Sequence, residues 1–484
     1  MSPLNRKTVP TNTYSERIVQ FGEGNFLRAF VDWMIHEMNK KTDFNAGVVV
    51  VQPIEKGLIK TLNDQDGLYT LYLNGIKNGE SISEHQVIDC IQRGIDPYDN
   101  YSDYLALAEN PGIRFVVSNT TEAGIAYNAE DKLDDSPPSS FPGKLTAFLH
   151  KRFEIFEGAP DKGLIVLPCE LIDQNGTNLK KIVLQYAADW GLGEEFTTWI
   201  NESNVFCNTL VDRIVPGYPG DKMDRITTEL GYEDNLVVEG EQFHLWVIQG
   251  PEIVKQEFPT ESYGLNVVFT HDIEPYRTRK VRILNGAHTS LVPVGYLYGI
   301  DKVRESLEDE VVGTFVKGAI FDEICPTLDL SEKELEQFAN DVLDRFRNPF
   351  LEHELISISL NSISKFKTRV LPSVLEYIKR KNELPKRLLF SLASLIVFYR
   401  GKRNGEIIEL SDSKEVLGFF DKLWSGVSDN SPQTVSEITL GVLSNRDFWN
   451  MDLTDLEGVS ALVTDYIHSI LTQGMNTALK TLDV

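Results

Sequence analysis

Three polar residues, Lys280, Asn285 and His288, lie on a stretch whose other residues are largely apolar. The apolar residues between 281 and 291 recur at helical spacing with no proline before Pro293, which predicts an α-helix. At about 100° per residue the three polar residues fall within an arc of about 140°, over an axial span of about 12 Å. Such a face suits a lysine reaching in from one end and a sugar-sized ligand lying along it. The alternative is three solvated polar residues on an amphipathic helix.

A glycine turn near the N-terminus has the composition of a dinucleotide-binding unit. Gly22 and Gly24 follow the apolar strand predicted at 17–21 and precede an amphipathic helix predicted at 29–38. Gly22 permits a sharp turn, Gly24 lets the backbone approach a pyrophosphate, and the helix N-terminus offers free N–H groups. The third glycine of the usual fingerprint is missing, and an ordinary turn is the alternative.

The next predicted strand, 47–51, is apolar throughout, as in a parallel strand buried on both faces. An NAD-specific site normally ends this strand with Asp or Glu on the ribose hydroxyls. Here Gln52 follows instead. Gln52 can hydrogen-bond a ribose, but without a carboxylate the discrimination against a 2′-phosphate stays open, and Lys56 does not settle it.

Two later apolar strands, predicted at 114–118 and 163–169, also end in polar residues. The hydroxyls of Ser118 and Thr120 suit ribose and nicotinamide contacts, although an ordinary polar loop is an equal alternative. Asn175 follows the second strand at the same predicted sheet edge, where it can face the nicotinamide. It can equally belong to a tight turn with no catalytic role.

The length and net charge of the chain indicate how many domains it has and which classes of partner it disfavours. A chain of 484 residues exceeds what one hydrophobic core usually supports, so two domains are expected. With 47 Lys+Arg against 72 Asp+Glu, the formal charge of −25 disfavours nucleic acid and anionic membranes as partners. An anionic substrate would therefore need a local basic pocket that works against the overall charge.

The four cysteines lie far apart in the sequence, with no Cys-x2-Cys pair, which argues against a disulfide scaffold and a zinc site. No bound metal is expected. The N-terminal segment lacks the apolar core of a signal peptide, and no run of about 18 apolar residues occurs. A cytoplasmic protein is expected.

The order of elements predicts an α/β protein with a domain boundary near residue 272. Residues 1–272 are expected to form a dinucleotide-binding domain with a Rossmann-like parallel sheet and a β insertion at about 60–90. Residues 273–484 are expected to form a mostly α-helical substrate and catalytic domain. The active site is predicted in the cleft between these domains.

The spacing Lys-x4-Asn-x2-His resembles the catalytic signature of the mannitol dehydrogenase family, the polyol-specific long-chain dehydrogenases. The glycine turn is similar to this family's Gly-x-Gly-x-Phe-x-Arg version. Further segments resemble the family in the same order along the chain, so the likeness spans most of the sequence: 118–122, 208–216, 280–297, 345–353 and 364–372.

The resemblance implies metal-free hydride transfer between NAD and a secondary alcohol of an open-chain sugar acid, with altronate and tagaturonate as the expected pair. It implies that Lys280 exchanges the proton, that Asn285 with Asn175 binds the developing oxyanion, and that His288 orients the reactive hydroxyl. For Lys280 to act near pH 7, burial or a neighbouring cation must lower its pKa from about 10.4.

The resemblance also implies two sets of binding residues. The residues expected to contact the cofactor are Gly22, Gly24, Asn25, Phe26, Gln52, Ser118, Thr120 and Glu122. Those expected to bind the substrate carboxylate are His353, Lys365 and Arg369, of which Arg369 can grip a carboxylate with two N–H groups. A solvated basic face is the alternative for the run around Lys365. The oligomeric state stays open.

Three other functions fit parts of the sequence. Mannitol 2-dehydrogenase or fructuronate reductase activity would use the same signature, whereas a non-catalytic nucleotide-binding or scaffold protein would need only the fold. Tyr276-x3-Lys280 also matches the catalytic pair of short-chain dehydrogenases. That interpretation is rejected because the chain is nearly twice too long, the glycine pattern is wrong, and Lys280 fits the longer signature.

Overall fold

The computed structural model describes residues 1–41, 43–77, 79–121, 123–427 and 429–483. These residues form two compact units. The first comprises Met1–Gly75 and Ile82–Ile273, and the second comprises Ile76–Ser81 and Glu274–Val484.

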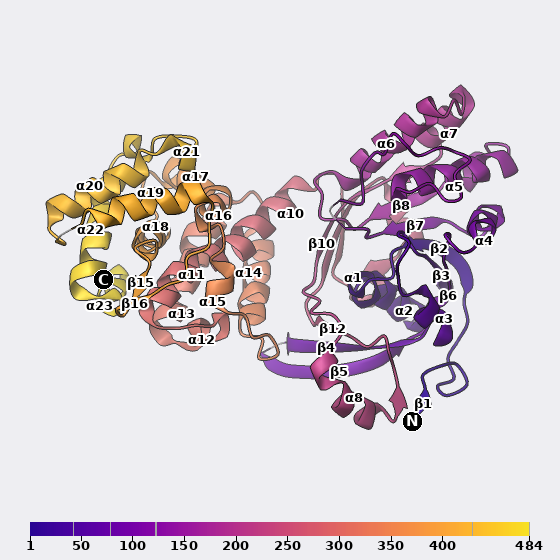
Figure 1. Cartoon of the computed structure of the whole chain (residues 1–484), viewed down its shortest axis with the longest axis horizontal. Helices are drawn as coiled ribbons and strands as arrows, with labels where there is room; N and C mark the ends of the chain where they lie inside the picture. Colours follow the sequence, from indigo (N-terminus) through magenta and orange to yellow (C-terminus); the bar gives the residue numbers. More distant parts are fainter. Residues whose placement is uncertain (42, 78, 122, 428, 484) are drawn as a thin grey trace. The chain divides into compact units, whose positions relative to one another are not determined.

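Within the described residues, six strands of the first unit form one sheet in the order β6-β3-β2-β7-β8-β9, with all neighbours parallel (Figure 1). This is the strand order of a doubly wound dinucleotide-binding fold, so the predicted Rossmann-like sheet is confirmed. The strands are β2 (Ser15–Phe21), β3 (Ala46–Val51), β6 (Ile91–Ile95), β7 (Phe115–Ser118), β8 (Ile165–Pro168) and β9 (Val205–Phe206).

Both faces of this sheet are buried, which explains the continuous apolar run in β3. Val48 and Val50 pack into one hydrophobic cluster, while Val49 and Val51 pack into another on the opposite face. The first cluster includes α1 (Asn25–Ala29), α2 (Val31–Lys41) and α3 (Ile59–Asp64). The second includes α4 (Tyr101–Ala106), α5 (Phe141–Ile155), α6 (Asn175–Asp189) and α7 (Glu194–Glu202), which lie together in Figure 1.

The helix after the glycine turn begins earlier than predicted and is interrupted. It starts at Asn25, breaks at Phe30 where φ is −128° and ψ is −78°, and resumes as α2. The buried guanidinium of Arg28 holds the turn: it donates to the backbone oxygens of Glu23 (3.1 Å) and Leu236. Because burial favours the neutral form, the pKa of Arg28 is lowered from its ordinary value.

The predicted β insertion at 60–90 is partly helical. Its first residues form α3, whose buried Ile59 and Leu62 have helical spacing, and strands follow only from Tyr69. Two smaller sheets in the first unit have the orders β12-β4-β5 and β10-β13-β14. Their strands are β4 (Tyr69–Lys77), β5 (Glu80–Ile88), β10 (Asn208–Asp212), β12 (Val238–Glu241), β13 (Leu245–Gln249) and β14 (Val267–Thr270).

The remaining elements of the first unit are short. A strand pair joins β1 (Ser2–Pro3) to β11 (Tyr232–Glu233), and two further helices are α8 (Met223–Leu230) and α9 (Glu252–Glu257).

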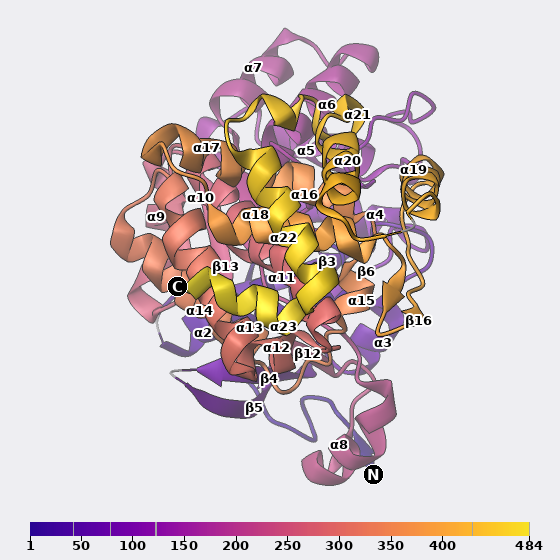
Figure 2. The same ribbon diagram turned by 90° about the vertical axis from the view of Figure 1, so that its left-hand side faces the viewer.

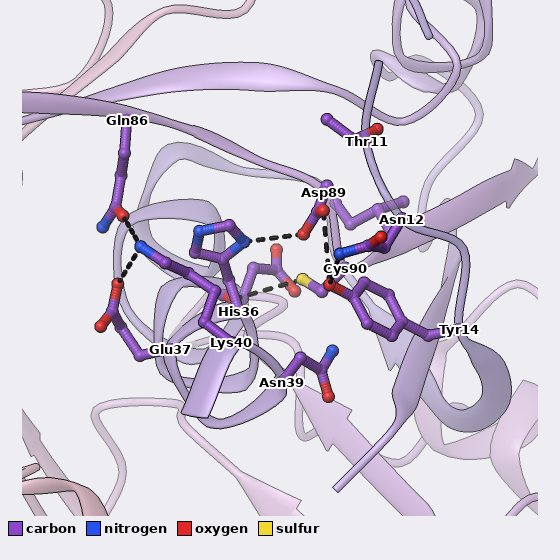
Figure 3. A network of polar contacts seen from close by, with 12 residues as sticks. Thr11, Asn12, Tyr14, His36, Glu37, Asn39, Lys40, Gln86, Asp89 and Cys90 are labelled. Atoms are coloured by element: carbon purple, nitrogen blue, oxygen red, sulfur yellow. Dashed lines mark hydrogen bonds and ion pairs between the residues drawn. The ribbon is translucent and has the colours of Figure 1, made fainter. Parts of the chain in front are cut away.

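A polar network fixes helix α2 against the connection from β5 to β6 (Figure 3). His36 Nδ1 donates to Asp89 Oδ1 at 2.7 Å, and both side chains are buried. The Tyr14 hydroxyl donates to the other carboxylate oxygen at 3.4 Å, and Cys90 Sγ donates to the backbone oxygen of Asp32 at 3.2 Å. The start of β6 is thereby held against the helix and the N-terminal segment.

The second unit is mostly helical, as predicted. Its centre is α18, whose residues from Leu388 to Phe398 are buried, and α22 lies beside it (Figure 2). Ser391 of α18 donates to the backbone oxygen of Ser290 at 2.9 Å, which joins this helix to α11.

The helical elements of the second unit are α10 (Glu274–Arg279), the π-helix η5 (Lys280–Asn285), α11 (Gly286–Tyr298), α12 (Val303–Glu308), α13 (Glu310–Gly318), the π-helix η6 (Ala319–Ile324), α14 (Glu332–Phe346), α15 (Leu355–Ile358), α16 (Ser362–Arg369), α17 (Leu371–Lys381), α18 (Lys386–Phe398), α19 (Lys414–Ser425), α20 (Pro432–Leu443), α21 (Arg446–Trp449), α22 (Val459–Gln473) and α23 (Met475–Lys480). A small hairpin pairs β15 (Lys402–Arg403) with β16 (Glu406–Ile407). None of the helices in the described ranges has both the length and the apolar character needed to span a membrane.

The two glycines of the N-terminal turn differ in what a side chain would meet, which gives a first prediction. Gly22 has φ +117°, and a Cβ there would lie 2.9 Å from the backbone oxygen of Asn119. Gly24 has φ −66° and nothing within 4 Å of that position. Gly22→Ala should therefore lower the free energy of unfolding by about 1–3 kcal/mol, whereas Gly24→Ala should change it little. Urea denaturation of both variants measures the difference, and equal losses would contradict it.

Candidate active site

The residues from Lys280 to Asn285 form a π-helix between α10 and α11. This corrects the predicted uninterrupted α-helix. The hydrogen bonds of a π-helix join residues five apart, so Lys280 and Asn285, at its two ends, lie one turn apart. Their side chains therefore project closer to the same face than they would in an α-helix, in which each residue turns by about 100°. Stretches of this kind are rare and frequently occur at functional sites.

The three signature residues are partly exposed, while four of the residues between them, Ile283, Leu284, Gly286 and Ala287, are buried. Lys280, Asn285 and His288 are each partly exposed, whereas Leu284 is 7% and Ala287 is 2% exposed. The segment therefore presents an amine, an amide and an imidazole on its accessible side and packs its apolar side into the unit.

The His288 ring is held in a fixed position. It stacks on Phe346 with ring centroids 4.0 Å apart and meets His353 edge-on at 5.3 Å. Its Nε2 is buried and has no hydrogen-bond partner among the described residues. Burial, followed by the charges of His353 and Arg345, lowers the pKa of His288 well below its ordinary value. The ring is therefore neutral near pH 7, with a nitrogen able to bond a ligand hydroxyl.

Cationic side chains from two helices gather around His288, beside the ring of His353. They are Arg345 at the end of α14 and Arg369 and Lys365 of α16, and each lowers the pKa of His288. The three substrate-binding residues predicted from the sequence are thus brought together. Arg345 was missed, although it begins the family-like segment 345–353. Such a cluster supplies the local positive potential that an anionic ligand needs in a chain of net charge −25.

A glycine allows α16 to approach the signature segment closely. A Cβ at Gly286 would lie only 3.1 Å from the backbone oxygen of Arg369. Burial lowers the pKa of the Arg369 guanidinium, and burial together with Arg369 lowers that of Lys365. Lys365 Nζ also donates to the backbone oxygen of Ile358 at 2.8 Å. Lys367 differs from these two, because its Nζ contacts Asn450 Oδ1 at 3.4 Å in an exposed position.

At the glycine turn of the first unit, the predicted cofactor residues have distinct environments. Gly24 has open space where a side chain would lie. Asn25 Oδ1 accepts a hydrogen bond from Arg28 at 2.7 Å, so its side chain helps to hold the turn. Phe26 stacks on Phe30, with centroids 5.0 Å apart. Gln52 follows β3 and is 3% exposed.

The polar residues after β7 are organised by a buried acid that the sequence reasoning missed. Ser118 is fully buried and donates to Glu170 Oε2 at 3.0 Å, while the backbone N–H and the hydroxyl of Thr120 both donate to Glu170 Oε1 at 3.0 Å. Burial raises the pKa of Glu170. The Ser118 hydroxyl is therefore engaged inside the protein rather than offered to a ribose. Glu122, also predicted to contact the cofactor, lies outside the described residues.

Asn175 has a structural environment rather than the predicted catalytic one. It is fully buried, and its amide nitrogen donates to the backbone oxygens of Pro168 (3.0 Å) and Glu170 (3.1 Å). Its oxygen accepts from the backbone N–H groups of Gly176 and Thr209, each at 2.9 Å. Both amide hydrogens are thus donated within the protein, so the geometry gives no support to Asn175 as an oxyanion donor.

Tyr276 lacks the properties of a tyrosine acid/base. Burial, with a smaller contribution from Glu334, raises its pKa above the ordinary value, whereas a proton-transfer role near pH 7 needs a lowered one. The guanidinium of Arg279 lies 5.2 Å from the Tyr276 ring centroid and 4.3 Å from that of Phe338. These observations favour the longer signature over the Tyr-x3-Lys interpretation.

Family models match both units of the chain. A model described as the mannitol dehydrogenase Rossmann domain matches residues 16–262, and one described as the mannitol dehydrogenase C-terminal domain matches residues 272–471. The chain belongs to the mannitol dehydrogenase family. The resemblance noted in the sequence is confirmed.

Relatives in this family match over their full length. A protein of Pectobacterium carotovorum subsp. carotovorum (strain PC1) named altronate oxidoreductase is 49% identical over 486 residues, covering 99% of both chains. One of the same name from Enterobacter sp. (strain 638) is 50% identical over 483 residues, covering 100% of both.

Two solved structures share the fold. The substrate-free form of D-sorbitol dehydrogenase matches with a TM-score of 0.77 at 23% identity, covering 99% of this chain and 100% of that one. Mannitol 2-dehydrogenase of Pseudomonas fluorescens, in a ternary complex with NAD and D-mannitol, matches with a TM-score of 0.64 at 23% identity, covering 99% of each chain.

The environment of His288 predicts how acid affects stability. Its pKa is lowered in the folded state, so the unfolded state binds a proton more readily as the pH falls below about 6.5. The free energy of unfolding should therefore decrease as the pH is lowered through this range, by up to about 1.4 kcal/mol per pH unit for this group. His288→Gln should make the decline between about pH 6.5 and pH 5 shallower, as measured by urea denaturation at several pH values. An unchanged slope would contradict the predicted role of this ring.

Proposed function

We propose that this protein is an NAD-dependent altronate oxidoreductase, which interconverts D-altronate and D-tagaturonate. The full-length relatives named altronate oxidoreductase at 49% and 50% identity carry this proposal. The signature residues on one accessible face of η5 and α11, beside a cluster of cations, supply the chemistry that a sugar acid requires.

The first unit has features that fit NAD. Gly24 leaves open space beside the backbone for a pyrophosphate, and the strand order is that of dinucleotide-binding sheets. Of the predicted contacts, we keep Gly22, Gly24, Asn25 and Phe26 at the turn and Gln52 at the ribose. Thr120, like Ser118, donates its hydroxyl hydrogen to Glu170 and is not kept. NAD, when bound, supplies the acceptor or donor of hydride for the carbon that is oxidised or reduced.

Three residues of the second unit would carry the proton chemistry. In the direction of reduction, Lys280 Nζ gives a proton to the substrate oxygen, and in oxidation it removes that proton. The Asn285 amide donates a hydrogen bond to the same oxygen as negative charge builds on it, and losing such a donor typically costs about 100-fold or more in rate. Neutral His288 orients the reacting hydroxyl through its Nε2.

The cation cluster would bind the carboxylate that distinguishes a sugar acid from a neutral polyol. Arg369 offers two parallel N–H groups, and Lys365 and Arg345 add positive potential. Burial lowers the pKa of His353, so its neutral ring would contribute hydrogen bonding rather than charge. This feature favours altronate over mannitol or fructose as the substrate pair. Whether the site lies in a cleft between the two units stays a prediction.

The proposal also concerns surroundings and partners. We place the enzyme in the cytoplasm, because the reaction draws on the cellular NAD pool and all four cysteines are free thiols. Its partner is a small sugar acid, and no nucleic acid or membrane partner is proposed.

Replacing the proposed acid/base tests the mechanism. Lys280→Ala should lower turnover of tagaturonate on the order of a hundredfold to ten-thousandfold, because proton transfer is lost, while NADH binding stays nearly intact. Stopped-flow turnover and NADH fluorescence titration measure the two effects. Tyr276→Phe is the matched control and should be mild. A crippled Tyr276→Phe beside an active Lys280→Ala would reverse the assignment.

Substrate choice tests the role of the cations. With NADH, the protein should reduce tagaturonate with a higher kcat/KM than fructuronate or fructose. Arg369→Gln should raise the KM for tagaturonate about 10- to 100-fold and leave the KM for NADH unchanged, because a charge-assisted contact to the carboxylate is lost. Lys367→Gln, on the same helix, should shift neither by more than about twofold. Preference for fructose, or equal effects of the two substitutions, would refute the carboxylate assignment.

A further inference from the structure

Strand β3 ends in an amide where dinucleotide-binding sheets that prefer NAD carry a carboxylate, but a carboxylate lies beside it on the next strand. Val51 pairs with Ile95 in the parallel register of β3 and β6, and the Gln52 N–H donates to the backbone oxygen of Ile95 at 3.0 Å. Gln52 and Asp96 are the next residues on the two strands. They therefore lie side by side at the carboxyl edge of the sheet.

Asp96 determines which end of the Gln52 amide is available. Gln52 Nε2 donates to Asp96 Oδ2 at 3.0 Å and to the backbone oxygen of Glu55 at 3.2 Å, which uses both amide hydrogens. The other Asp96 oxygen accepts from the backbone N–H of Tyr98 at 2.9 Å, so the carboxylate is itself held. Gln52 Oε1 has no hydrogen-bond partner within the described ranges. What the amide offers to a ligand is thus an acceptor and not a donor.

A second carboxylate lies next to this oxygen. A Cβ at Gly57 would lie 2.4 Å from Gln52 Oε1 and 2.1 Å from Glu23 Oε1, so both oxygens lie next to the backbone of Gly57. Glu23 belongs to the glycine turn and accepts from the backbone N–H of Leu58 at 3.2 Å. The absence of a side chain at Gly57 lets the loop fold closely over both groups.

The two dinucleotides differ at this position in hydrogen-bonding capacity as well as in charge. A ribose 2′-hydroxyl has a hydrogen to donate to Gln52 Oε1, as it would to an aspartate. A 2′-phosphate is an anion that mainly accepts, so it would meet an acceptor oxygen with Asp96 and Glu23 close behind it. Reversing the amide would present N–H groups to the phosphate, but it would turn Oε1 toward the Asp96 carboxylate.

We propose that Asp96 orients Gln52 so that the pair selects NAD over NADP, in place of the carboxylate that β3 lacks. This inference rests on the proposed NAD-dependent function and assigns its cofactor preference. Gln52 is the residue that contacts the ribose, and Asp96 is a positioning residue that acts through it.

The test compares NADH and NADPH binding to the full-length protein by fluorescence titration, together with kcat/KM for each cofactor with tagaturonate. Asp96→Asn keeps the shape but allows the Gln52 amide to turn. It should lower the NADH-over-NADPH affinity ratio at least about tenfold, equivalent to about 1.4 kcal/mol. Gln52→Ala should weaken NADH binding and also lower the NADH-over-NADPH affinity ratio. It serves as the second variant if Asp96→Asn does not fold. Asp99→Asn, which removes the same charge at an exposed position, should leave the ratio within about twofold.

The outcomes separate the two proposals. A wild-type protein that prefers NADH, with a preference relaxed by Asp96→Asn but not by Asp99→Asn, supports the assignment. A protein that reduces tagaturonate with NADH but keeps its preference in both Asp96→Asn and Gln52→Ala overturns the assignment and leaves the proposed function standing. Equal binding of NADH and NADPH by the wild-type protein also overturns it. Failure to bind either cofactor would refute the proposed function itself.

Discussion

The arrangement of the signature residues in the second unit depends on one local distortion, the π-helical stretch from Lys280 to Asn285. A regular α-helix would rotate these residues apart, whereas hydrogen bonding between residues five apart brings the lysine and the amide to neighbouring positions. The following α11 then carries His288 on the accessible side, while Ile283 and Leu284 remain in the core. The distortion is thus compatible with burial of the apolar face, which anchors it.

Around that stretch the protein gathers positive charge against its overall sign. Arg345, Lys365 and Arg369 come from two helices, and Gly286 allows α16 to approach closely enough for its cations to act on His288. Burial is the main cause of the lowered pKa of the ring, and each of these charges lowers it further. The same field that would hold a carboxylate therefore helps to keep the imidazole neutral.

In the first unit, polar residues at the carboxyl edge of the sheet mostly bind one another. Glu170 organises Ser118 and Thr120, Arg28 holds the glycine turn, and Asp96 orients Gln52. These contacts leave the oxygen of Gln52 unpaired within the described residues, next to Gly57, and Gly24 keeps open space where a side chain would lie. Recognition at this edge thus depends on how a few groups are oriented as much as on which residues are present.

The sequence by itself determined the fold class, the family and the identity of the signature residues. The reason is that these depend on local patterns: an apolar run for a two-sided strand, a glycine pair in a turn, and the spacing Lys-x4-Asn-x2-His. It did not determine the π-helix, because the apolar residues of that segment satisfy an α-helical pattern equally well.

Nor did the sequence distinguish the Asn175 and Ser118 side chains, which bond inside the protein, from the Gln52 oxygen, which has no partner in the described part of the chain. Those outcomes depend on partners such as Thr209, Glu170 and Asp96, which lie 34, 52 and 44 residues away along the chain. Only the tertiary structure brings such groups within hydrogen-bonding distance. It therefore decides which polar atoms are already paired and which remain for a ligand.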